Sequence, residues 1–327
     1  MRSRRLRWGG GFLVLVSALA LFAPWLGLRD PASQPDGLVL RELPPLSRAE
    51  FVRLADGEVR YAHEMRELPG GAAEIRRGAT WTRIEAESLE GSAPGESRGR
   101  ALFVLGTDTY GRDLLSRLIH GARASLLVGL VAAALALGLG TLVGALAGLA
   151  GGWVDGLLMR FTDLLLAVPR LFLALMLVAI YGPSLSTTIL VLGVTTWMPA
   201  ARLVRGQVLS VRERDFVRAA RAAGVPPLRL ALRHVLPTAA APLLVEGALR
   251  VGETILLEAA LSFLGLGVPA PAPSWGNLIA DGRDSLLHAW WISTLPGLAI
   301  AGTVVALNLV GDAARDHLGS PRHSHPA

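Results

Sequence analysis

VRERDFVRAARAAGVPPLRLALRHVLP, which is residues 211–237, lies between two long apolar runs of the chain. The stretch is basic and amphipathic, because only two acids accompany its six arginines. A segment with this many guanidinium groups does not span a bilayer, since each buried charge is costly there. We expect two short helices at the membrane surface, over 214–223 and 228–236, with Gly224 ending the first. The remainder of the chain must hold this helix pair.

The composition is that of a protein with several membrane spans. The chain has 327 residues, of which 52% are hydrophobic, which is too apolar for a single soluble domain. Every basic residue is Arg, and we interpret the net charge of +6 as a signal of membrane orientation, not of nucleic-acid binding. The absence of Cys excludes disulfides, thiolate metal sites and thiol nucleophiles. The histidines show no metal-ligand spacing, so no metal site is expected.

Six apolar runs are about long enough to cross a bilayer. We therefore expect an all-α, polytopic fold with six transmembrane helices and a cytoplasmic coupling helix pair. Asp163, Pro169 and Arg170 interrupt the third run. The runs cover about 9–28, 124–150, 157–181, 185–201, 238–266 and 289–310.

The first run follows four arginines, which places the N-terminus in the cytoplasm if the span is retained. A cleaved signal peptide begins in the same way, and residues 18–20 resemble a cleavage site. Counting spans from a cytoplasmic N-terminus puts residues 211–237 on the cytoplasmic side, and their arginines demand the same side. The C-terminus is then cytoplasmic too.

These spans predict a division of the chain into four parts. The first is a tail and first span at 1–28, followed by an extracytoplasmic loop and interfacial segment at 29–123. A core of five transmembrane helices covers 124–316 and includes a cytoplasmic coupling loop at about 205–237. A cytoplasmic tail covers 317–327.

The segment 29–100 differs from the spans because it is polar, with mixed charge and several Pro and Gly residues. Leu38–Leu40 and Val59–Tyr61 are candidates for short strands. The segment is either a variable insertion or a ligand-binding module.

Residues 105–123 read LGTDTYGRDLLSRLIHGAR. Gly106 and Gly111 predict tight turns, Thr107 or Asp108 is a candidate helix cap, and an amphipathic helix is expected from Asp113. Arg112 lies in the same motif. In the run that follows, three glycines recur at a spacing of four, which lets helices approach closely. They are Gly140, Gly144 and Gly148.

Charged residues share one face of the fifth span. Glu246, Arg250 and Glu253 are at i, i+4 and i+7, so they fall on the same side of a helix. Ionisable groups inside a span face protein or water. Either Arg250 pairs with both acids and locks the span to a neighbour, or the stripe lines a translocation path. Glu258 points away from this stripe and is expected to be structural.

Several motifs together resemble the permease subunits of dipeptide, oligopeptide and nickel ABC importers of bacteria, over about 105–316. The family's coupling motif contains a Glu-Ala-Ala triplet, then a Gly and a Leu-Pro. Here Arg218-Ala219-Ala220, Gly224 and Leu236-Pro237 occupy those places, with Ala223 beside the glycine. Arg218 departs from the usual Glu. The 106–113 motif, EAALSFLG at 258–265 and PSWGN at 273–277 also resemble this family, and the pattern is similar to its second, C-type subunit.

The resemblance implies a subunit of an ATP-driven importer in the bacterial inner membrane. It implies a second permease subunit that forms a heterodimer, two ABC ATPase subunits and an extracytoplasmic solute-binding protein, all surrounded by lipid. The cargo class covers peptides, nickel chelates and glutathione-like solutes. The chain lacks the Lys of a phosphate-binding GxxxxGK loop, so ATP is expected to be used by the partners and no cofactor to be bound here.

Two other classes are alternatives. A secondary transporter or channel needs no ATPase, but the sequence shows no convincing internal repeat. A membrane-bound enzyme needs a nucleophile–base pair or a metal cluster, and the sequence shows neither.

Overall fold

A computed structural model describes the chain except for residues 1, 91–96, 227–228, 230–232, 234–235 and 319–327. The chain forms two compact units. Unit 1 comprises Met1–Ala18, Ala124–Pro269 and Ile300–Ala327, and unit 2 comprises Leu19–Arg123 and Ala270–Ala299. Three long helices, α1 (Arg2–Phe22), α2 (Leu114–Ala150) and α11 (Trp291–Leu318), contribute residues to both units.

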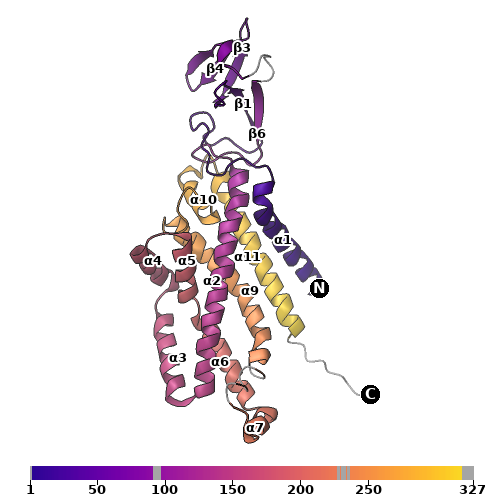
Figure 1. The fold of residues 1–327 in the computed structure, drawn as a ribbon, viewed down its shortest axis with the longest axis vertical. Helices are drawn as coiled ribbons and strands as arrows, with labels where there is room; N and C mark the ends of the chain where they lie inside the picture. The colour runs from indigo at the N-terminus through magenta and orange to yellow at the C-terminus, as the bar shows by residue number, and fades with distance from the viewer. Residues whose placement is uncertain (1, 91–96, 227–228, 230–232, 234–235, 319–327) are drawn as a thin grey trace. The chain divides into compact units, whose positions relative to one another are not determined.

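Unit 1 is helical, as the apolar runs predict. Between α2 and α11 the chain forms six further described helices in this unit (Figure 1). They are α3 (Gly152–Ala167), α4 (Arg170–Tyr181), α5 (Leu185–Thr195), α6 (Met198–Arg212), α7 (Asp215–Ala222) and α9 (Leu236–Phe263). The expected all-α, polytopic class is confirmed for this part of the chain.

Four helices or helix pairs are individually long and apolar enough to cross a membrane, among the residues that the structure describes. They are 6–25, 114–150, 185–212 and 291–316. The predicted third span is two helices, α3 and α4, which meet at an angle of 86° and add a fifth if counted as one bent span. Pro169 lies at this break, where its ring disfavours helical geometry in the preceding residue.

The expected span that remains, the fifth at 238–266, is α9. It has 28 residues and therefore extends roughly 42 Å at 1.5 Å per residue, which is enough for a bilayer. It also carries Glu246, Arg250, Glu253 and Glu258, so composition alone does not identify it as a span. Six spans therefore remain a prediction.

The close approach predicted from the glycines of α2 is confirmed. A Cβ on Gly140 would lie 2.6 Å from the Cβ of Ala200, and one on Gly144 would lie 2.3 Å from the carbonyl oxygen of Ala201. A Cβ on Gly148 would lie 2.7 Å from Val208. Because each glycine removes a side chain, α2 and α6 pack backbone to backbone along three successive turns.

Unit 2 contains two antiparallel three-stranded sheets that the helical prediction did not include. One has the strand order β2-β1-β6 and the other β3-β4-β5. Buried apolar side chains from both sheets, including Val52 and Ile75, form a shared core. The strands are β1 (Ser47–Arg53), β2 (Val59–Ala62), β3 (Glu64–Glu67), β4 (Ala73–Arg77), β5 (Thr80–Ile84) and β6 (Arg98–Phe103).

One of the two expected strands in this segment is confirmed and one is wrong. Val59–Tyr61 lies in β2. Leu38–Leu40 forms a turn, because Asp36 draws the backbone N–H groups away from a strand ladder. Its carboxylate accepts from the N–H of Leu38 and Val39, and its carbonyl accepts from the N–H of Leu40.

The segment at 268–288, which links the fifth and sixth expected spans, contains the short helix α10 (Trp275–Asp281). Ser274 begins this helix by accepting from the N–H of Asn277, whose side chain accepts in return from the Ser274 N–H. This reciprocal pair is a capping box, and it explains why a Pro-rich segment turns helical.

Candidate functional site

The predicted coupling segment begins directly after α6. Only Glu213 and Arg214 separate α6 from α7, and α7 covers Asp215–Ala222 where 214–223 was expected (Figure 1). Gly224 follows with a backbone φ of +79°, a conformation that glycine adopts without a Cβ penalty. The first helix of the predicted pair is therefore present, and the glycine ends it as expected. Most of the second, 228–236, lies outside the described residues.

One face of α7 packs against α2 and α6 in unit 1, and the other face is open. Val217 is fully buried and Ala220 is half-buried, in a cluster that also holds Val211 of α6 and Leu149 of α2. Ala219 and Ala223 are exposed. The open side of the helix therefore presents small alanine side chains next to the larger Phe216 and Arg218.

The remaining residues of the coupling motif lie at the edges of this surface. Arg218 stands where the family has Glu, and its Nη2 lies 2.5 Å from Glu213 Oε2, with both side chains mostly exposed. Pro237 is exposed in the first turn of α9, where the missing N–H costs no helical hydrogen bond. The side chain of Leu236 lies outside the described residues.

The charged stripe of α9 forms a connected cluster in unit 1. Arg250 is 5% exposed and pairs with both Glu246 and Glu253, as the i, i+4 and i, i+3 spacings allow. Arg170, the first residue of α4, pairs with the second oxygen of Glu253. The cluster thus holds two arginines against two glutamates, which cancels their charges. Sequence reasoning noted Arg170 only as an interruption of the third span.

Exposure differs along the cluster. The side chain of Arg250 is 6% exposed, whereas those of Glu246 and Glu253 are 22% and 37% exposed. The buried guanidinium therefore lies between two carboxylate side chains that are partly exposed. Arg250 pairs with both acids, as one of the two alternatives expects, but within α9, and the link to a neighbouring helix is the pair of Arg170 with Glu253. A role of the stripe in a translocation path stays a prediction.

Glu258 lies apart from that cluster and is fully buried. Its carboxylate accepts from the hydroxyl of Ser125 on α2 at 3.1 Å and from that of Ser262, one turn along α9, at 2.7 Å. These contacts join α2 to α9 within unit 1, as a structural residue would.

The 106–113 motif builds a buried ion network in unit 2. Asp108 is fully buried and lies 2.6 Å from Arg112 Nε and 3.3 Å from Arg117 Nε. Both arginines also pair with Asp281 of α10, at 2.8 and 3.3 Å. Burial raises the pKa of the Asp281 carboxyl, although the nearby guanidinium groups of Arg112 and Arg117 oppose that rise.

The other members of this motif shape its backbone. Gly106 has a φ of +78°, and a Cβ there would lie 2.3 Å from the carbonyl oxygen of Leu43. Gly111 has a φ of +77°. The side chain of Asp113 accepts from the N–H of Leu115 and so caps α2. The expected cap at Thr107 or Asp108 is therefore wrong, because Asp108 instead accepts from the N–H groups of Tyr110 and Arg112.

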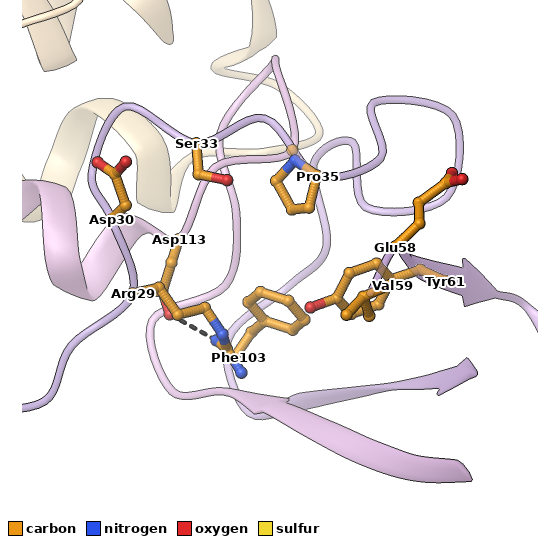
Figure 2. Close-up of a pocket in the computed structure, with 10 residues that line it drawn as sticks. Arg29, Asp30, Ser33, Pro35, Glu58, Val59, Tyr61, Phe103 and Asp113 are labelled. Atoms are coloured by element: carbon orange, nitrogen blue, oxygen red, sulfur yellow. Dashed lines mark hydrogen bonds and ion pairs between the residues drawn. The ribbon is translucent and has the colours of Figure 1, made fainter. Parts of the chain in front are cut away.

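A pocket of about 480 Å³ opens in unit 2 beside this motif (Figure 2). Arg29 lies against Asp113, with Nη1 and Oδ2 2.6 Å apart, and its guanidinium is 4.2 Å from the ring centroid of Phe103. The Tyr61 hydroxyl points toward these groups (Figure 2) and has no hydrogen-bond partner in the described part of the chain. Burial raises the pKa of Tyr61, so this hydroxyl stays protonated as a donor.

The described part of the chain contains no candidate metal site. No group of three or more His, Cys, Asp or Glu side chains is placed there to hold an ion.

Comparisons with known proteins identify the family of this chain. Residues 140–321 match the family model described as "Binding-protein-dependent transport system inner membrane component". The chain is 40% identical over 307 residues to the di/tripeptide transport system permease protein DppC of Pseudomonas aeruginosa, covering 94% of this chain and 85% of that protein. It is 39% identical to the oligopeptide transport system permease protein OppC of Haemophilus influenzae, over 65% of this chain and 68% of that one.

A solved structure shows the same fold. The inward-facing MetNI methionine ABC transporter contains a chain that superposes with a TM-score of 0.53 at 16% identity, covering 63% of this chain and 97% of that one. At this identity the likeness concerns the fold alone. The family match covers more than half of this chain, and the identity to relatives extends over nearly all of it. The chain therefore belongs to the family of binding-protein-dependent transport system inner membrane components, and it is a permease subunit of an ABC importer.

Proposed function

We propose that this subunit forms half of a translocation path for peptides or a related small solute. The relatives named above are di/tripeptide and oligopeptide permeases, and this supports peptides as the cargo class. Nickel chelates and glutathione-like solutes are the other members of the expected range. Uptake of labelled di- and tripeptides by a deletion strain, with and without the restored gene, tests the assignment. Equal uptake by both strains would contradict it.

Energy enters through partner subunits, in this proposal. Two ABC ATPase subunits bind and hydrolyse ATP, and this chain binds no cofactor of its own. The observation that carries the proposal is α7, a short helix with one open side, joined to α6 by two residues and followed by Gly224. A cleft of the ATPase receives this surface, and closure of the ATPases displaces α7 and tilts the helices attached to it.

A second permease subunit completes the path as a heterodimer. The partly exposed side chains of Glu246 and Glu253 line the water-facing side in this proposal, and their ion pairs with Arg250 fix their positions. Carboxylates at this place suit the charged amino end of a peptide. Copurification with an ATPase subunit and a second permease, using a tag on this chain, tests the assembly. A secondary transporter or channel would purify without an ATPase.

The protein lies in the bacterial inner membrane with both termini in the cytoplasm, and the 29–100 segment is extracytoplasmic. The domain limits proposed from sequence, 1–28, 29–123, 124–316 and 317–327, follow from this topology. Protease added outside spheroplasts then cleaves within 29–100 in intact cells. Cleavage that appears only after lysis would refute the orientation.

The 29–100 segment also helps to dock the solute-binding protein. The pocket beside Arg29 and Tyr61 supports this, because it offers a hydroxyl donor and an aromatic floor on an extramembrane unit. Binding of the solute-binding protein to the Tyr61→Phe variant tests the contribution of that hydroxyl. Unchanged affinity would exclude this pocket from the interface.

A further inference from the structure

The residue that ends α6, just before α7, is hydrogen-bonded to the C-terminal end of α2. Arg212 is the last residue of α6, and its Nη1 donates to the carbonyl oxygens of Gly148 at 2.8 Å and Leu149 at 3.4 Å. Both carbonyls are in the last turn of α2, which ends at Ala150. The last four carbonyls of an α-helix have no partner within the helix, and a cation there is also favoured by the helix dipole.

The local sequence makes room for this contact. Gly148 lacks a side chain, so Val208 of α6 packs against its backbone while its carbonyl accepts from Arg212. Gly151, with a φ of +65°, follows the last residue of α2. The guanidinium of Arg212 lies beside it, since a Cβ built on Gly151 would be 3.5 Å from Arg212 Nη1. A second attachment lies about two turns earlier on α6, where Arg205 binds Asp155 of α3 through two bonds of 2.6 and 2.7 Å.

Apolar packing continues the attachment into α7. Val211, next to Arg212, and Val217 of α7 are buried in one cluster with Leu149 and Ala145 of α2. The junction between α6 and α7 is only two residues long, and Arg214 N–H donates back to Val211 carbonyl oxygen at 3.1 Å. The end of α2, the end of α6 and the buried face of α7 therefore share one set of contacts.

We infer that Arg212 is a positioning residue for the coupling helix, which fixes α7 to the C-terminal end of α2. A displacement of α7 is then transmitted to α2 and α6 together. Without the guanidinium, the two carbonyls lose their donor and the α6–α7 junction absorbs part of the displacement. The transport consequence rests on the proposed coupling function, whereas the positional consequence does not.

The experiment uses the complete transporter in lipid nanodiscs and exploits the absence of Cys in this chain. Spin labels at Leu146→Cys on α2 and Ala222→Cys on α7, both exposed positions, report the distance between the two helices. Arg212→Gln removes the donor charge. Arg214→Gln is the matched control, since Arg214 is exposed and its side chain makes no ion pair or hydrogen bond among the described residues. Arg212→Lys keeps a cation that can reach a carbonyl.

We expect a single narrow distance distribution in the unmodified protein and the Arg214→Gln variant, and a broadened one in Arg212→Gln. Arg212→Lys should restore most of the narrow distribution. Uptake per ATP hydrolysed should fall in Arg212→Gln relative to Arg214→Gln, because the α6–α7 junction absorbs part of the displacement of α7. A distribution in Arg212→Gln as narrow as in Arg214→Gln would overturn the inference. If Arg212→Gln does not assemble, Arg212→Met takes its place, since it keeps an unbranched side chain but neither the charge nor the N–H donors. A distribution in Arg212→Met as narrow as in Arg214→Gln would likewise overturn the inference.

The two hypotheses fail in different ways. If the label distance broadens while uptake per ATP is unchanged, Arg212 positions α7 but α7 does not couple transport. If substitutions at Gly224 uncouple transport while the label distance in Arg212→Gln stays narrow, coupling stands and the role of Arg212 is rejected.

Discussion

Arg170 of α4 and Glu253 of α9 are 83 positions apart in the sequence and form an ion pair between the two helices. Arg170 begins α4 immediately after the 86° break, so the pair ties the bend to the middle of α9. Glu253 also accepts from Arg250, and one carboxylate therefore serves two guanidinium groups. Removal of one member leaves the others with unbalanced charge, which is more costly than the absence of the pair.

This relationship predicts non-additive stabilities. Arg170→Gln alone should lower the free energy of unfolding by about 1–2 kcal/mol, less than for a fully buried pair because both side chains are partly exposed. Arg170→Gln combined with Glu253→Gln should cost less than the sum of the single changes. Thermal stability of the purified subunit in detergent, measured for all four proteins of the cycle, checks this. Strict additivity would mean that the pair contributes nothing.

Gly224 provides a test of the coupling segment. A β-branched residue at a φ of +79° costs about 1–2 kcal/mol in backbone strain, so Gly224→Val should distort the end of α7. We expect ATP hydrolysis to continue while uptake falls, because the surface offered to the ATPase is displaced. Gly156→Val is the control, since Gly156 lies inside α3 and a Cβ there meets no atom within 4 Å. Normal uptake by Gly224→Val would remove this segment from the coupling mechanism.

The α9 stripe can be probed by thiol labelling because the chain contains no Cys. Single Cys residues at Glu246 and Glu253 should react with a small aqueous thiol reagent, since both side chains are partly exposed. Ile255→Cys, at a fully buried position on the same helix, is the unreactive control. Cargo or the nucleotide state of the ATPase should change the reaction rate at 246 and 253. Rates as low as that of the control would assign the stripe to a buried helix contact only.

Local patterns in the sequence predicted much of this molecule, because they depend on neighbouring residues. The spacing of Glu246, Arg250 and Glu253 predicted that they share a helical face, with their pairing as one of two alternatives, and Gly224 correctly marked the end of α7. Long-range partners left no such pattern. Arg112 meets Asp281 across 169 positions, and nothing near either residue indicates the other.

The strands of unit 2 show a second reason for incomplete prediction. Leu38–Leu40 has the apolar character of a strand, but the preceding Asp36 captures its N–H groups and forms a turn. Conversely, β3 and β5 are mostly exposed, so their sequences lack the alternation that identifies a half-buried strand. Short-range hydrogen bonding and sheet edges therefore decided the structure where hydrophobic patterning was weak.

Gly144 and Gly138 of α2 allow a direct comparison of a closely packed and an open glycine in one helix. Gly144→Ala places a Cβ 2.3 Å from the carbonyl oxygen of Ala201, a backbone atom that cannot rotate away, so α2 and α6 must separate. Gly138→Ala is the matched control, because a Cβ there meets nothing within 4 Å and the same gain in helix propensity applies. We expect Gly144→Ala to lower the free energy of unfolding by about 1–3 kcal/mol, the range for overpacking, and Gly138→Ala to be neutral or stabilising. Thermal unfolding of the two purified variants provides the measurement. Equal stability would show that the α2–α6 interface yields without cost, and the tight attachment between these helices would then not transmit the movement of α7.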